Sequence, residues 1–317
     1  MRLKKMLVPM FAIYFVYGLI VTLLRRELGF TFGMDLTLES WFVGTLLNGH
    51  QFQLNYPMWF IAPFVLAQIV FVALRTSCHW LELRAGRRVA ARRSGQVACA
   101  LCILLGLITV LAGGPDGLPA GVLCLLTRVG FLCSWIAIGR LYVAVLRKRD
   151  TLGNAWYYLV VVVMLLALYY VCDGSITYIP SWSKFPRGIV GTYAATGLCI
   201  AALWRACRIL EPVVRGSRIV LALSSNTFSV MCHHMMGFFV LNCLAWAVSE
   251  STGALGLFDA EEWHASVNYA YLPHGIPQFG IARMIFAVCF ALAVHTAWVR
   301  IRRACAGLLG RARAAKA

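Results

Sequence analysis

The sequence predicts an all-α protein, a bundle of about eight helices that cross a lipid bilayer. Three observations predict it: the apolar composition, the length of the apolar runs and the placement of the basic residues. Hydrophobic residues make up 61% of the 317 residues and charged residues 13%, with a mean hydropathy of +0.77. Soluble domains carry roughly 25% charged residues. A chain this apolar needs lipid as the solvent for most of its surface.

Eight stretches are long enough, or nearly so, for a span of about 20 apolar residues. They cover residues 6–24, 58–74, 97–112, 120–145, 155–172, 189–207, 219–248 and 279–299. The third is short, and the fourth and seventh are long enough to tilt. The N-terminus opens like a signal peptide but lacks an Ala-x-Ala cleavage site, so we expect an uncleaved first span.

The basic residues indicate the sidedness of these spans. With the N-terminus inside and eight alternating spans, 23 of the 29 Lys and Arg residues fall on the cytoplasmic side and four outside. This is the asymmetry of the positive-inside rule. It predicts a multi-pass protein of the cell membrane with both termini cytoplasmic. We therefore attribute the net charge of +17 to basic residues that face the anionic cytoplasmic leaflet. We expect no nucleic-acid partner.

The twelve cysteines predict neither disulfides nor a metal site. Half of them lie inside apolar runs, where Cys behaves as a small hydrophobe. Cys99 and Cys102 have redox-motif spacing but open a membrane segment. The run Cys232-His233-His234 has no second Cys/His pair at a suitable spacing.

Two long connections emerge on the predicted outer side. Residues 25–57 contain an amphipathic stretch, 36–47, in which Trp41 and Phe42 suit the membrane interface. Residues 249–278 carry acidic residues and histidines but no Lys or Arg. Long connections in compact proteins tend to be functional. No soluble domain or internal repeat is evident, so we expect one membrane domain over 1–317.

Ionisable groups at membrane depth usually face a bundle interior or a wet cavity. Arg128, Asp173 and Arg283 fall at similar outer depth on three predicted spans. With His50 and Trp59 at the outer mouth of the second span, they would line one outward-facing pocket for a polar acceptor. The alternative is that the arginines snorkel to outer headgroups and that an Arg–Asp pair is structural.

Two adjacent histidines lie mid-depth in the seventh predicted span. Neighbouring helical residues point about 100° apart, so at most one of His233 and His234 faces a pocket. A neutral imidazole there would serve as a general base towards a hydroxyl. The alternative is a hydrogen bond to a neighbouring helix.

Three stretches together resemble the integral-membrane acyltransferase type 3 family, which includes O-antigen and other surface-glycan O-acetylases. Arg2-Leu-Lys-Lys5-Met-Leu-Val-Pro9 is similar to the family's basic R-x-x-R segment at the inner end of a span. Tyr56-Pro-Met-Trp59-Phe-Ile-Ala-Pro63 is similar to its L-W-F-L segment. Ser225-Asn-Thr-Phe-Ser-Val-Met-Cys-His-His234 is similar to its N-[ST]-x-x-I-Y-x-x-H run. Their order, spacing and sidedness agree.

The resemblance implies a transferase that moves an acyl group, usually acetyl, from cytoplasmic acyl-CoA to a hydroxyl of an extracytoplasmic glycan or lipid-linked sugar. Acyl-CoA would be a co-substrate, with no bound cofactor and no metal. By position, Arg2 and Lys5 would stand near the donor, Trp59 would belong to the pocket, and His234 would be catalytic.

The chain also departs from the family pattern. Family members carry two further spans ahead of the basic segment, and the first of these bears an Arg and a His central to acyl transfer. Lys5 replaces the second Arg, which loses bidentate geometry. We therefore expect a longer reading frame, a separate two-span partner fragment or an inactive descendant. The alternatives are a non-catalytic membrane module and a lipid or glycan transporter, which the lack of an inverted repeat disfavours.

Overall fold

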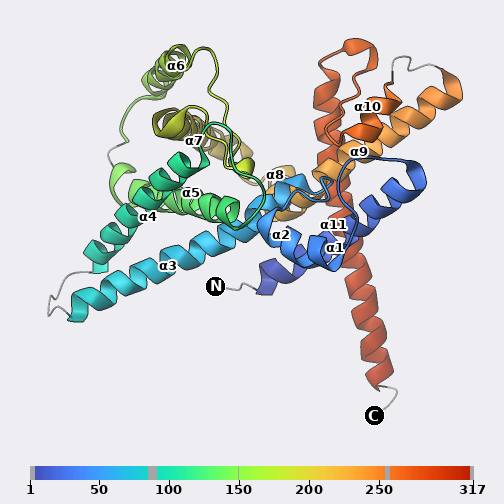
Figure 1. Ribbon diagram of the computed structural model, residues 1–317, viewed down its shortest axis with the longest axis horizontal. Helices are drawn as coiled ribbons and strands as arrows, with labels where there is room; N and C mark the ends of the chain where they lie inside the picture. Colours follow the sequence, from blue (N-terminus) through green and yellow to red (C-terminus); the bar gives the residue numbers. More distant parts are fainter. Residues whose placement is uncertain (1–3, 85–90, 149, 254–257, 315–317) are drawn as a thin grey trace. The chain divides into compact units, whose positions relative to one another are not determined.

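The computed structural model describes residues 4–84, 91–148, 150–253 and 258–314, and this part of the chain is helical almost throughout (Figure 1). Among the described residues, the β-structure consists of one isolated antiparallel bridge between Ile179 and Lys184. The prediction of an all-α fold is confirmed. The chain divides into two compact units. The first unit comprises Met1–Lys4, Leu46–Asn48 and Trp59–Arg215, and the second comprises Lys5–Thr45, Gly49–Met58 and Gly216–Ala317.

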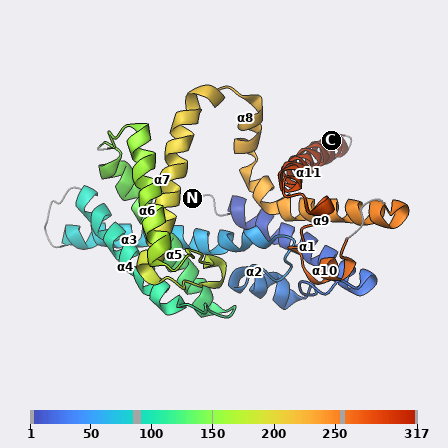
Figure 2. The ribbon, with the colours of Figure 1, turned by 90° about the horizontal axis from the view of Figure 1, so that it is seen from above.

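The first unit contains five long helices. They are α3 (Ile61–Arg84), α4 (Ala91–Gly113), α5 (Val122–Leu141), α6 (Asn154–Val171) and α7 (Gly188–Val214). Helices α3, α4 and α5 pack against one another, and α6 runs beside α7 (Figure 2). Close approach of α4 and α5 requires a residue without a side chain, since a Cβ at Gly130 would overlap Thr109. Cys99, Cys102 and Cys133 lie in the apolar core between these helices.

The second unit is built on three long helices and several short ones. They are α1 (Lys4–Leu28), a π turn (Glu39–Val43) that continues into α2 (Gly44–Leu47), α8 (Arg218–Ser225), α9 (Thr227–Thr252), α10 (Ala260–Ala265) and α11 (Phe279–Ala314). Helices α9 and α11 lie side by side (Figure 1). A Cβ at Gly237 would lie 2.7 Å from the Cα of Ala287, so the glycine permits this contact. The hydroxyl of Ser229 also donates to the carbonyl of Ala291 (3.0 Å).

Within the described residues, seven helices are long and apolar enough to cross a membrane. These spans are Leu7–Leu28, Tyr56–Arg84, Arg93–Gly113, Val122–Leu146, Asn154–Val171, Thr227–Thr252 and Phe279–Cys305. Their apolar side chains are widely exposed. In α6, for example, only Val161 and Leu168 are buried, whereas Leu159 and Val163 are about half exposed. Helices that are apolar all round lie in lipid or in a large core, and the side chains of α6 are mostly exposed instead of packed in a core. The protein is a multi-pass membrane protein.

The structure differs from the predicted spans at two places. The sixth predicted span, 189–207, is part of the 27-residue helix α7, which is not among the seven. The seventh, 219–248, is not one helix, because the chain leaves helical geometry at Asn226 (φ −114°, ψ 16°). The Asn226 amide donates to the carbonyl of Ala222 (2.7 Å) and so competes with the backbone ladder. The span is α9 alone.

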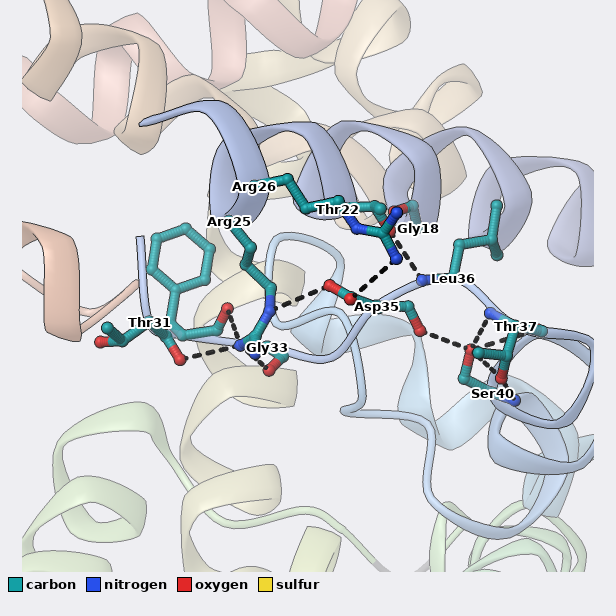
Figure 3. A network of polar contacts seen from close by, with 11 residues as sticks. Gly18, Thr22, Arg25, Arg26, Thr31, Gly33, Asp35, Leu36, Thr37 and Ser40 are labelled. Atoms are coloured by element: carbon teal, nitrogen blue, oxygen red, sulfur yellow. Dashed lines mark hydrogen bonds and ion pairs between the residues drawn. The ribbon is translucent and has the colours of Figure 1, made fainter. Parts of the chain in front are cut away.

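The connection after α1 is held by arginine side chains (Figure 3). Arg25 donates to the carboxylate of Asp35 (3.1 Å) and to the carbonyls of Gly33 (2.7 Å) and Thr31 (3.0 Å). Arg26 pairs with the same carboxylate at 3.3 Å. Both arginines are basic residues that the topology places on the outer side. A local acid partner explains their presence there.

The stretch predicted to be amphipathic, 36–47, forms the π turn and α2. Its polar residues Ser40 and Thr45 are buried, whereas Leu38 is 75% and Phe42 45% exposed. The indole of Trp41 donates to the carbonyl of Phe11 (2.9 Å) and fixes the turn on α1. Polar residues inside and apolar residues outside are the pattern expected of a segment that faces lipid.

Candidate functional site

A cavity of about 260 Å³ lies in the second unit, between α9, α11 and the connection 266–272. It is lined by Met235, Phe238, Val267, Asn268, Ala270, Gly280, Arg283 and Met284. The connection is fixed to both helices through one backbone carbonyl, that of Tyr269. This oxygen accepts from Asn242 on α9 (3.0 Å) and from Arg283 on α11 (3.2 Å). The wall of the cavity is therefore tied to its two supporting helices.

The side chain of Tyr269 anchors the same connection. Its hydroxyl accepts a hydrogen bond from the backbone N–H of Asp259 (2.9 Å). Burial raises the pKa of the Tyr269 phenol above its ordinary value, so the group stays neutral. A neutral phenol suits this place because Asp259 and Glu262 lie nearby and would repel a phenolate.

Arg283 is the charged group of the cavity. Its side chain is only 8% exposed, and its guanidinium lies over the ring of Phe238, 5.3 Å from the ring centroid. Its Nε is buried and has no hydrogen-bond partner among the residues that the structure describes. A buried cation with unused donors is costly unless something polar satisfies them. Arg283 is therefore suited to bind a polar or anionic group in the cavity.

His234 stands one helical turn before Phe238 on α9. Its Nδ1 lies 2.9 Å from the carbonyl oxygen of Val230. A carbonyl only accepts, so Nδ1 carries the proton and Nε2 of the neutral ring is left as an acceptor. The imidazole meets the Phe238 ring edge-on, with centroids 5.9 Å apart and planes at 89°. His234 and Arg283 therefore both contact Phe238, at the border of the cavity.

The neighbouring histidine has a different role. Nδ1 of His233 lies 2.7 Å from the hydroxyl of Tyr17 on α1, and the two rings are 5.9 Å apart. Tyr17 is itself buried. His233 is thus the histidine that bonds to a neighbouring helix, and His234 is the one beside the cavity.

Arg128 and Trp59 lie together in the first unit. The guanidinium of Arg128 is 5.4 Å from the centroid of the Trp59 ring. It donates to the carbonyls of Asn48 (2.9 Å) and Ser181, and the residue is 1% exposed. Such burial is incompatible with snorkelling to headgroups. Arg128 fastens two connections to α5.

Four other predicted site residues are Asp173, His50, Arg2 and Lys5. The carboxylate of Asp173 is 90% exposed and pairs with Arg187 at 3.6 Å, an arrangement that contributes little stability. His50 is buried and stacks on Tyr56, with ring centroids 4.3 Å apart and planes at 11°. Arg2 lies outside the described residues, and for Lys5 only the helical backbone is described.

Sequence reasoning missed Phe238, Tyr269 and Asn242. Asn242 offered a signal, since a lone amide within an apolar run usually has a partner. The other two could not be told from ordinary aromatic residues of a membrane protein. No protein-family model, curated protein or solved structure matches the chain. Fold and site define an all-α multi-pass membrane protein with a buried arginine at a cavity and a histidine that contacts one lining residue, Phe238.

Proposed function

We propose that this protein is an acyltransferase of the plasma membrane. It would transfer an acyl group, acetyl in the simplest case, from cytoplasmic acyl-CoA to a hydroxyl of an extracytoplasmic glycan or lipid-linked sugar. The three ordered motifs support this class of reaction, because they resemble one family of membrane acyltransferases. The placement of His234 beside a cavity with a buried arginine is the observation that carries the proposal.

The geometry of His234 suits a general base. Its Nδ1–H is held by the carbonyl of Val230, which orients the ring and leaves Nε2 to accept a proton. Arg283 supplies donors for the oxygen atoms of an acceptor or for a developing oxyanion.

The reaction balances with these groups. The acceptor hydroxyl gives its proton to Nε2 of His234 while its oxygen attacks the thioester carbonyl carbon. The carbon–sulfur bond then breaks, an oxygen ester forms, and the CoA thiolate leaves and takes up the proton. Arg283 would stabilise the negative charge on the carbonyl oxygen between attack and departure.

Variants of the two adjacent histidines test this proposal. The chain is expressed in cells that make hydroxyl-bearing surface glycans, with and without a separate two-span segment of an active family member. Ester-linked acetyl groups are then released by mild alkali and quantified. We expect His234→Gln to lower acetylation by roughly a hundred- to ten-thousand-fold. His233→Gln is the matched control and should keep acetylation within a few-fold wherever the protein is present at normal levels.

Two outcomes would contradict the proposal. One is acetylation that survives in His234→Gln. The other is an absence of acetyl transfer by the unmodified chain in both settings, which would favour a carrier or a non-catalytic module instead.

A further inference from the structure

A second cavity, of about 190 Å³, lies in the first unit where α3, α4 and α5 come together. Arg75 of α3 and Arg140 of α5 both line it, with Gly95 and Gln96 of α4 between them. The π turn Tyr142–Leu146, which continues α5, forms part of its wall. Such widened turns within helices are frequent at functional sites.

The two arginines of this cavity lack acidic partners. Neither makes a salt bridge or a hydrogen bond with another residue in the described part of the chain, and no carboxylate lines the cavity. The guanidinium of Arg140 lies over the ring of Phe71, 5.3 Å from the centroid. Both side chains are exposed, so solvent screens their mutual repulsion in part, and an anion that contacts both would still be favoured.

Other arginines of the same unit show the contrast. Arg205 and Arg208 both bind the carboxylate of Asp150, each at 3.1 Å. The charges of Arg205 and Arg208 are therefore partly neutralised by a neighbouring carboxylate. Arg75 and Arg140 have no such carboxylate partner among the described residues, and both line the same cavity.

We propose that this cavity binds a phosphate group, with Arg75 and Arg140 as its cationic walls and Gln96 as a further donor. Guanidinium groups match the oxygens of phosphate in a bidentate manner. Ligand pockets for whole small molecules usually measure about 300–1,000 Å³. A volume of about 190 Å³ therefore fits a headgroup-sized anion.

Two sources carry this chemistry. Arg140 lies near the C-terminal end of α5, and Arg75 lies in the second half of α3. Both are on the side that the charge pattern predicts to be cytoplasmic, where the leaflet is anionic. The phosphate would belong either to an anionic phospholipid or to a soluble phosphorylated compound such as CoA. With a phospholipid the inference goes beyond the proposed acyl transfer, and with CoA it rests on that proposal as a site for the donor. It uses neither His234 nor Arg283.

Binding by the full-length protein tests the proposal in two arms. In the lipid arm, the protein is placed in nanodiscs of phosphatidylcholine with or without phosphatidylglycerol, and retained lipids are identified by native mass spectrometry. In the soluble arm, inorganic phosphate and CoA are titrated in neutral detergent, with thermal stabilisation as the readout. Saturable binding in at least one arm is expected, and the arm that responds identifies the source.

Variants then locate the binding. Arg75→Gln with Arg140→Gln should weaken it by about tenfold or more for each arginine. Arg84→Gln with Arg147→Gln removes the same charge from outside the cavity and should change it less than threefold. Gly95→Leu keeps every charge but adds a bulky side chain to the lining of the cavity. The substitution should be tolerated, because a Cβ at Gly95 meets no atom within 4 Å. It should also weaken binding at least tenfold.

Three results would overturn the proposal. They are the failure of both arms with the unmodified protein, equal weakening by the two double variants, and unchanged binding in Gly95→Leu. The last variant adds bulk in open space, so its fold should be intact, and normal thermal unfolding of the unliganded variant would establish this.

Discussion

Replacing Arg128 by Met should destabilise the protein far more than replacing Arg283 by Met, although both arginines are buried. Arg128 donates to the carbonyls of Asn48 and Ser181. A hydrogen bond that involves a charged group contributes about 1.5–3 kcal/mol, so two such bonds contribute about 3–6 kcal/mol. Arg128→Met removes both and leaves buried carbonyls unsatisfied, so it should destabilise the protein by an amount in this range.

Arg283 differs in the number of donors that are satisfied. Its Nη2 donates to the carbonyl of Tyr269 at 3.2 Å, and that carbonyl keeps a second donor, Asn242. The lost bond contributes about 1.5–3 kcal/mol, whereas the buried unpartnered Nε costs about 1–3 kcal/mol. These terms nearly cancel. Arg283→Met should therefore leave stability almost unchanged while it abolishes the proposed acyl transfer.

The measurement is thermal unfolding of the purified variants in one detergent, with monodispersity followed in parallel. Arg128→Met should unfold many degrees below the unmodified protein, and Arg283→Met within a few degrees of it. If the two variants lost equal stability, Arg283 would be a structural anchor like Arg128.

Three further predictions concern the fold and its orientation. Gly237→Val should destabilise the pair α9–α11 by several kcal/mol, because its side chain meets the backbone of α11, and unfolding midpoints will show this. Arg205→Ala strands the buried carboxylate of Asp150 and should cost about 3–5 kcal/mol in a urea titration, less what Arg208 still supplies. In intact cells, an impermeant thiol reagent should modify a cysteine that replaces Asp116 but not one that replaces Gly153. Labelling of the unmodified protein is the background for both. The reverse pattern would contradict the predicted sidedness.

The long apolar runs made the helices predictable, since a run of this length has no alternative in lipid but to satisfy its backbone internally. The break at Asn226 was harder to foresee. Ser, Asn and Thr occur singly in membrane helices, and whether they interrupt one depends on local hydrogen bonds. The run Ser224-Ser-Asn-Thr227 was a signal, because four such residues in succession compete strongly with the helical ladder.

Candidate site residues could be selected from the sequence, but their contacts could not be predicted. Arg283 and His234 could be selected because ionisable groups in spans are rare. Which of two adjacent histidines faces a cavity depends on Tyr17, which is 216 residues away from His233 in the sequence. The partners of Arg128 are backbone carbonyls, one of them 80 residues distant. Backbone atoms carry no sequence signature, so the anchoring role of Arg128 could not be deduced.

The length of α11 has a practical consequence for anyone who tags the protein. At 1.5 Å per residue, its 36 residues extend about 54 Å, against about 30 Å for the hydrocarbon thickness of a bilayer. About 24 Å of rigid rod, with five arginines between positions 300 and 313, therefore stands clear of the lipid tails. A fluorophore or affinity handle fused behind it will be held beyond the headgroups without an added linker.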